Sequence, residues 1–417
     1  GQVGEQAVEV TTPGGTTEVP GGFTYTPTPT ATSISPAAGP VAGGTAFTIT
    51  GTHLQDATVT IGGVPVAVTV GGGGTTLTGT TPPGTLGNKP VIITTPGGQA
   101  TVPGGYTYTT TNIYVTNSGV GGNSVSVIDP GTNTVTTTIP LGNISPQQVA
   151  ITPDLTRAYV VNFQSNSVSV IDTANNTVIT TITSVGTQPQ GVAITPDGTK
   201  AYVANSGPGV NNVRVINIPA NTLGPTIPVG TAPRYVAITP DGTRAYVTNR
   251  DSNSVSVIDT ATDTVIATIT GVGTNPAGIA ITPDGTKAYV VNNGSGNVRV
   301  INIPANTLGP TIPVGFNPLI VAITPDGTKA YVTNAGAGSV SVINTATDTV
   351  LTTITGVVTQ PRGIAITADG TKAYVANFTS NNVRVIDTAS NTLIGSAITV
   401  GSSPVGVAAT PLPYPAP

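Results

Sequence analysis

Residues 245–290 read AYVTNRDSNSVSVIDTATDTVIATITGVGTNPAGIAITPDGTKAYV, and they contain one full copy of a repeated unit. Its tetrad, Tyr-Val-(Thr/Val/Ala)-Asn, occurs seven times at intervals of 42 to 45 residues, beginning at Tyr114, Tyr159, Tyr202, Tyr246, Tyr289, Tyr331 and Tyr374. A period of about 40 to 45 residues, filled with short apolar runs and turn residues, is typical of one four-stranded propeller blade. The sequence therefore predicts an all-β protein with a seven-bladed β-propeller at residues 110–412.

Each unit is predicted to hold four strands. Around residue 200, GVAIT at 191–195 predicts the innermost strand, an Asp-Gly turn follows, and AYVAN at 201–205 predicts the second strand. The apolar density falls from the first strand to the fourth, which predicts burial that decreases from the axis to the rim. The first tetrad has no innermost strand before it, so we expect the strand at 405–409 to complete the first blade beside residues 113–117 and close the ring. Residues 413–417 then form a tail.

The composition excludes several classes of function. Charged residues make up 7% of the chain, the net charge is −4, and no cluster of basic residues occurs, which argues against nucleic acid as a partner. No apolar run is long enough to predict a transmembrane segment. Cysteine is absent, which removes thiol chemistry and favours the cell exterior. The absence of methionine indicates a processed or partial chain.

The region before the repeats predicts a small β-sandwich at residues 32–109, because short strands there alternate with Gly and Pro turns. Residues 7–25 (AVEVTTPGGTTEVPGGFTY) match residues 90–108 (PVIITTPGGQATVPGGYTY), so residues 1–27 are interpreted as the last hairpin of another such sandwich. A lone hairpin is marginally stable in water. Either the parent protein continues upstream with more sandwiches, which we favour, or the hairpin adds to the open sheet edge of a neighbouring subunit.

Two family resemblances follow from these motifs. Residues 32–109 resemble the immunoglobulin-like IPT/TIG domain, from the SISP motif at 33–36 to the end strand at Tyr106–Tyr108. The repeats resemble the YVTN-type β-propeller repeat, which is known from prokaryotic surface-layer and other exported proteins. This second resemblance implies an extracellular or cell-surface location more firmly than any activity, because the same scaffold also occurs in enzymes.

No set of side chains predicts a catalytic, cofactor or metal site. The recurring Asp residues lie in turns, where Asp bonds to its own backbone. A Lys or Arg stands two positions before six of the seven tetrads, and it is expected to be solvated or to pair with the turn Asp. His53 is the single histidine, so it supplies neither a zinc site nor a His-based triad. The repeats are so similar that no single blade is predicted to be modified for a ligand. Arg214, Arg299 and Arg384, which recur in the third strand, are the candidate ligand or partner face.

Three functional hypotheses remain open at this point. The preferred one is a non-catalytic structural or adhesive protein of a prokaryotic cell surface, a subunit of a surface layer, sheath or filament. Its partners would be copies of itself or other surface proteins. The alternative is a module that binds a glycan or a protein through a propeller face. The third, an enzyme on the propeller scaffold, is disfavoured because no ionisable side chains cluster in the sequence.

Overall fold

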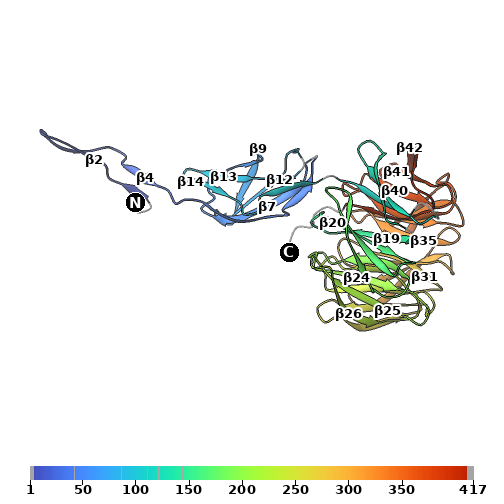
Figure 1. Cartoon of the computed structure of the whole chain (residues 1–417). Helices are drawn as coiled ribbons and strands as arrows, with labels where there is room; N and C mark the ends of the chain where they lie inside the picture. The colour runs from blue at the N-terminus through green and yellow to red at the C-terminus, as the bar shows by residue number, and fades with distance from the viewer. Residues whose placement is uncertain are drawn as a thin grey trace. The chain divides into compact units, whose positions relative to one another are not determined.

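The structure is a computed structural model that describes residues 4–41, 43–85, 87–109, 111–119, 123–142 and 144–410. The described residues form strands, turns and bends, and none of them is helical. The chain divides into two compact units (Figure 1), Gly1–Thr110 together with Pro413–Pro417, and Thr111–Leu412. The tail predicted at 413–417 lies outside the described residues.

Residues 30–109 form the β-sandwich predicted from the sequence, with strands grouped in three sheets. The first sheet has the order β10-β11-β7-β5, with bounds Val68–Gly71, Thr76–Thr80, Ala46–Thr52 and Thr30–Ser35. The second has the order β14-β13-β8-β9, with bounds Gly98–Thr101, Val91–Thr95, Thr58–Ile61 and Val64–Val66. The third has the order β12-β15-β6, with bounds Gly87–Lys89, Tyr106–Thr109 and Ala38–Pro40. Alternate residues of these strands, such as Ile49, Leu77 and Ile93, are buried in one shared core.

Residues 4–25 form two small strand pairs, as the hairpin interpretation predicts. Strand β1 (Gly4–Gln6) pairs with β4 (Phe23–Tyr25), and β2 (Glu9–Thr12) pairs with β3 (Gly15–Glu18). The register is that of the end of the sandwich, because Gly4 lies opposite Tyr25 as Gly87 lies opposite Tyr108. This segment therefore reproduces the pairing of β12–β15 and β13–β14.

The propeller has seven blades, each an antiparallel sheet of four strands (Figure 1). The innermost strands are β19 (Pro146–Ile151), β23 (Pro189–Ile194), β27 (Pro233–Ile238), β31 (Pro276–Ile281), β35 (Pro318–Ile323), β39 (Pro361–Ile366) and β43 (Pro404–Ala409). The second strands carry the tetrads: β16 (Ile113–Asn117), β20 (Arg157–Asn162), β24 (Lys200–Asn205), β28 (Arg244–Asn249), β32 (Lys287–Asn292), β36 (Lys329–Asn334) and β40 (Lys372–Asn377).

The two outer positions of each blade complete the sheets. The third strands are β17 (Ser124–Asp129), β21 (Ser167–Asp172), β25 (Asn212–Asn217), β29 (Ser254–Asp259), β33 (Asn297–Asn302), β37 (Ser339–Asn344) and β41 (Asn382–Asp387). The outermost strands are β18 (Thr134–Pro140), β22 (Thr177–Thr183), β26 (Thr222–Pro228), β30 (Thr264–Thr270), β34 (Thr307–Pro313), β38 (Thr349–Ile354) and β42 (Thr392–Thr399).

Burial in the blades corrects the expected gradient from the axis to the rim. The second strands are buried throughout the tetrad, as in Ala201–Asn205, and the outermost strands are mostly exposed. The innermost strands, however, are only partly buried, because part of each faces the space around the axis. The most enclosed part of the propeller is therefore one strand away from its centre.

The ring closes through the last strand of the chain. Strand β43 pairs antiparallel with β16, with Val407 opposite Val115 and Ala409 opposite Ile113, so it is the innermost strand of the first blade. The apolar seam beside this blade joins Ile113 and Val115 to Tyr374 and Val383 of the last blade. The two ends of the propeller sequence thus share one sheet, and closure leaves no unpaired innermost edge there.

The tetrad tyrosines connect each blade to the next. All seven rings are buried, and each hydroxyl donates a hydrogen bond to an Asn or Asp in the outer turn of the following blade. The seven pairs are Tyr114–Asn176, Tyr159–Asn221, Tyr202–Asp263, Tyr246–Asn306, Tyr289–Asp348, Tyr331–Asn391 and Tyr374–Asn133. The last pair crosses the closing seam. Burial raises the pKa of Tyr114 to about 12, so its hydroxyl stays protonated as a donor at neutral pH.

Two lysines strengthen these contacts between blades, which corrects the pairing expected from the sequence. Lys200 lies 2.8 Å from Asp263 and Lys287 lies 2.8 Å from Asp348, each in the following blade. The carboxylates of the neighbouring turns, Asp197 and Asp284, instead accept bonds from adjacent threonines. The sequence predicted an Asp partner for these lysines, but the Asp that pairs with each lysine belongs to the following blade and not to the lysine's own turn.

Candidate ligand-binding site

The innermost strands differ from one another at two positions only, apart from exchanges among small or branched apolar residues. In chain order they read PQQVAI, PQGVAI, PRYVAI, PAGIAI, PLIVAI, PRGIAI and PVGVAA. The leading Pro is constant and the final three residues barely change. In β27, for example, Pro233 pairs with Asn249, and residues 236–238 pair with residues 245–247 of β28. The second and third positions range from Gly to Arg. Because the rest of the repeat is nearly uniform, this variation shows that pairing within the sheet does not determine the residue type at these two positions.

The second positions come together around a cavity of about 550 Å³. Every blade contributes one of them, and the seven residues are Gln147, Gln190, Arg234, Ala277, Leu319, Arg362 and Val405. Tyr235 and Ile320, at the third position of two blades, also line the cavity. This volume is within the range of about 300 to 1,000 Å³ that is typical of small-molecule sites.

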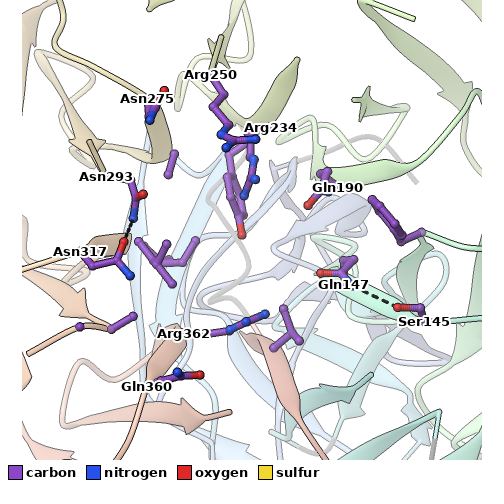
Figure 2. Close-up of a pocket in the computed structure, with 18 of the residues that line it drawn as sticks. Ser145, Gln147, Gln190, Arg234, Arg250, Asn275, Asn293, Asn317, Gln360 and Arg362 are labelled. Carbon is purple, nitrogen blue, oxygen red and sulfur yellow. Dashed lines mark hydrogen bonds between the residues drawn. The ribbon is translucent and has the colours of Figure 1, made fainter. Parts of the chain in front are cut away.

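The loops that flank these strands add polar side chains to the cavity. Ser145, Asn275, Asn317 and Gln360 precede the innermost strands, and Asn293 follows a tetrad (Figure 2). Amide groups both donate and accept hydrogen bonds, so this lining suits a ligand with many hydroxyl or carbonyl groups. Two of these amides are hydrogen-bonded to each other, with Asn293 as the donor and Asn317 as the acceptor.

The charge of the cavity is positive. Arg234, Arg250 and Arg362 line it, whereas its described lining contains no Asp or Glu. Arg250 has a long contact of 3.7 Å to the exposed Asp251. In the part of the chain that the structure describes, the guanidinium groups of Arg234 and Arg362 have no carboxylate within ion-pair distance. Arg362 instead lies over the ring of Phe378, 3.5 Å from its centroid.

Burial changes the pKa values of the three central groups. It lowers the pKa of the Arg234 guanidinium and that of Arg362, and the positive charge of Arg234 adds to the effect at Arg362. Burial raises the pKa of the Tyr235 hydroxyl, and the charges of the two arginines offset only part of that rise. Arg234 and Arg362 nevertheless stay cations at neutral pH, because the ordinary pKa of a guanidinium is far higher, and they lie beside the neutral phenol of Tyr235.

The structure places the three arginines named from the sequence elsewhere. Arg214, Arg299 and Arg384 lie on β25, β33 and β41, in three blades that are not neighbours, and none of them lines the central cavity. Arg214 donates to the carbonyl of Gly224 at 3.2 Å and Arg299 donates to the Thr311 hydroxyl, so both bond to the outer strand of their own blade. A ligand face built from these residues stays a prediction.

The repeated turn carboxylates have structural bonds. Asp284, for example, accepts hydrogen bonds from the Thr282 hydroxyl at 2.5 Å and from the Thr286 backbone N–H at 3.0 Å. These two bonds hold the pKa of Asp284 below its usual value. Asp154, Asp197, Asp241, Asp326 and Asp369 accept the same pair of bonds.

The described residues contain neither a cluster of metal-binding side chains nor a helix that could span a membrane. No three His, Cys, Asp or Glu side chains come close enough together to hold a metal ion. No helix among these residues has the length and apolar character needed to cross a membrane.

The residues of the central cavity were not predicted from the sequence. The repeats read as uniform, with no blade modified for a ligand, but the second position is Arg in β27 and β39 and Gln, Ala, Leu or Val in the other innermost strands. The signal that could have found them was the variation at the second and third positions of the innermost strands. Aligning the seven strands against one another reveals it without any homologue.

Comparisons with known proteins agree with this architecture. A family model described as YNCE-like beta-propeller matches residues 87–412, and a model of the IPT/TIG domain matches residues 29–110. No curated protein matches the chain.

Solved structures share the propeller fold. Kuenenia stuttgartiensis hydrazine synthase is 28% identical over 64% of this chain and 90% of its own, with a TM-score of 0.57. A protein of unknown function from Desulfotomaculum acetoxidans is 20% identical over 73% of this chain and 99% of its own, with a TM-score of 0.64. The dihydro-heme d1 dehydrogenase NirN is 16% identical over 71% of this chain and 74% of its own, with a TM-score of 0.53. At such low identity, the last two likenesses concern the fold alone.

Proposed function

Because this chain belongs to the YNCE-like β-propeller family, a scaffold that does not dictate one activity, we propose that it is a non-catalytic binding protein with an adhesive role outside a prokaryotic cell. The chain binds its partner, a component of the cell surface, in the central cavity of the propeller. The propeller and the IPT/TIG domain both fit a binding or structural module.

The single observation that carries this proposal is the location of the differences between blades. Seven innermost strands share their first residue and the apolar type of their fourth, and they diverge at the second position, which lines the cavity in every blade, and at the third, which lines it in two. A scaffold that served only as a spacer has no need for half-buried cations, yet Arg234 and Arg362 occupy second positions that Ala277 and Leu319 fill in other blades. A binding site does need such differences, since a ligand without sevenfold symmetry requires an asymmetric lining.

The lining also supports binding rather than catalysis. Its described side chains are arginines, amides, aromatic and aliphatic groups and Ser145, which recognise a ligand by charge and hydrogen bonds. The carboxylates of the turns are engaged by threonine hydroxyls and backbone N–H groups. The location outside the cell is supported by the resemblance of the repeats to YVTN-type surface proteins and by the lack of cysteine.

The test is adhesion of the purified chain to cell envelopes of its source, with the cavity filled by a bulky side chain. Gln190→Trp fills the cavity from β23, and Ile266→Trp adds the same side chain on the outermost strand β30, where Ile266 is exposed. We expect Gln190→Trp to lower adhesion at least tenfold and Ile266→Trp to leave it unchanged, with equal melting temperatures. Equal adhesion of the two variants would contradict the proposal. Failure of the unmodified chain to adhere to the envelopes would contradict it as well.

A further inference from the structure

We propose that the group bound in the central cavity is the carboxylate of an acidic sugar, held between Arg234 and Arg362. This inference rests on the proposed function and names the class of ligand that the site selects. It is carried by the charge, the position and the surroundings of the two arginines.

The first step concerns the missing negative charge. Arg234 and Arg362 are half-buried beside one cavity, which Arg250 also lines and whose described lining has no carboxylate. The charge of Asp251 acts on Arg234, but the pKa of that guanidinium is still lowered, so the positive charge is compensated only in part. Removing a guanidinium from water without a partner is costly, and two in one cavity cost more. An anion bound between them restores the balance, and the planar fork of Arg matches the two oxygens of a carboxylate.

The second step concerns position. Arg234 is on β27 and Arg362 is on β39, which are three blades apart in a ring of seven. The two side chains therefore enter the cavity from well-separated parts of its wall, as Figure 2 shows. Stacking on Phe378 at 3.5 Å holds the Arg362 guanidinium in place while its N–H groups stay free for a ligand. Two donors fixed on different blades can hold one anionic group from two directions.

The third step concerns the rest of the ligand. Around the two cations the lining is neutral and rich in amides, with Gln147, Gln190 and Asn275 among them. Such groups pair with the hydroxyls of a sugar, which donate and accept like the amides themselves. Tyr235 adds an aromatic ring to this wall. One negative charge on a body covered with hydroxyls is the chemistry of a uronic or sialic acid.

The same lining argues against other anions. A nucleic acid or another polyanion needs a long track of cations, whereas this chain has 13 Lys and Arg against 17 Asp and Glu, and no run of basic residues in its sequence. An acidic peptide would present a carboxylate on a chain with few hydroxyls, which would leave much of the amide lining without partners. The cavity of about 550 Å³ has room for a short saccharide.

The test uses the full chain and isothermal titration with three probes. These are a uronic acid disaccharide, the neutral disaccharide of the same linkage, and a short peptide rich in glutamate. We expect the uronic acid to bind at least tenfold more tightly than either of the others, because only it satisfies both the arginines and the amides. Between pH 5 and 8 the affinity should be constant, since a sugar carboxyl stays ionised there.

Matched variants locate the binding site. Arg234→Gln and Arg362→Gln should each weaken uronic acid binding about tenfold or more, and Arg214→Gln, which removes an arginine from β25 outside the cavity, should not change it. Equal melting temperatures of all variants, and unchanged affinity for the neutral disaccharide, separate lost charge from lost fold.

Each outcome decides one of the two proposals. Peptide binding that depends on the arginines, without uronic acid binding, would overturn the acidic sugar and leave the cavity as the adhesive face. Equal affinity for the charged and the neutral disaccharide would also overturn it. If Gln190→Trp leaves adhesion to cell envelopes unchanged, the proposed function itself fails, whatever the titrations give.

Discussion

Residues 8–25 and residues 91–108 have nearly the same sequence and the same strand pairing, but they differ in what packs against them. In the sandwich, Ile93 and Tyr106 are 0% exposed, whereas Val10 and Phe23 at the matching positions are 47% and 56% exposed. Even the aromatic contact is shared, since Phe23 and Tyr25 meet edge to face as do Tyr106 and Tyr108.

This difference shows that strand pairing in a hairpin depends on residues close in the sequence, whereas burial of the side chains depends on the strands that pack against it. Turn residues and alternation suffice to bring β2 beside β3, just as they bring β13 beside β14. Strand β13 also pairs with β8, and its inner face packs on a core that includes Phe47 and Leu77. The same apolar pattern therefore stabilises a domain in one place and is exposed in the other.

The largest loss of stability should follow from removing β43, a terminal segment that, unlike residues 4–25, pairs with a strand of a folded domain. Deleting residues 404–417 removes β43 from the first blade, with its hydrogen bonds to β16 and the buried Val405. Hydrogen bonds and burial together are worth about 5 kcal/mol or more, so the melting temperature of the propeller should fall by about 10 °C or more. Deleting residues 1–27 is the matched control and should leave it unchanged. An unchanged melting temperature after the first deletion would contradict closure of the ring by β43.

Amide hydrogen exchange compares the two matched segments directly. The Val19 N–H bonds to Val8 O at 2.7 Å, and the Val102 N–H bonds to Val91 O at 2.9 Å. Exchange at Val102 requires opening of the sandwich, whereas Val19 exchanges after local opening of a hairpin, so Val102 should be protected about 10³-fold more. Equal protection at both sites would mean that residues 4–25 have a packing partner in solution.

Truncating one aromatic ring in each segment tests the same contrast by stability. Tyr106→Ala should destabilise the sandwich by about 3 kcal/mol or more, because a fully buried ring leaves a cavity behind. Phe23→Ala at the matching position should leave its stability unchanged. Denaturant unfolding followed by exchange of the β7 amides measures both. A similar loss in the two variants would show that Phe23 packs on the sandwich core.

The smallest effect concerns charge in the exposed hairpin. Glu9 lies directly opposite Glu18, where the sandwich has Ile92 opposite Thr101. Like charges in this position repel, so Glu9→Lys should raise the protection of the hairpin amides by less than about fivefold. Protection in Glu9→Gln should lie between that of the unmodified chain and that of Glu9→Lys. The gain should vanish at high salt. A gain that persists at high salt would point to a cause other than charge.

Much of the fold could be predicted from the sequence because it rests on local signals. The spacing of the tetrads predicts seven blades, and the Asp-Gly turns predict the hairpin between the innermost and second strands. The strand count also predicted the pairing of residues 405–409 with residues 113–117, which the structure contains. The burial gradient was wrong, because composition does not reveal that the innermost strands face a cavity.

The sequence by itself determined the repeat, the strands and the turns, since each depends on hydrogen bonds between residues close in the chain. Only the tertiary structure decided which side chains meet across blades, such as Tyr202 with Asp263, and which ones line the same cavity, such as Arg234 and Arg362. Those contacts depend on how seven sheets are arranged around one axis, which no single repeat encodes. The arginines of the third strand were conspicuous in the sequence because they recur, whereas the cavity residues differ from blade to blade and become a site only when the ring closes.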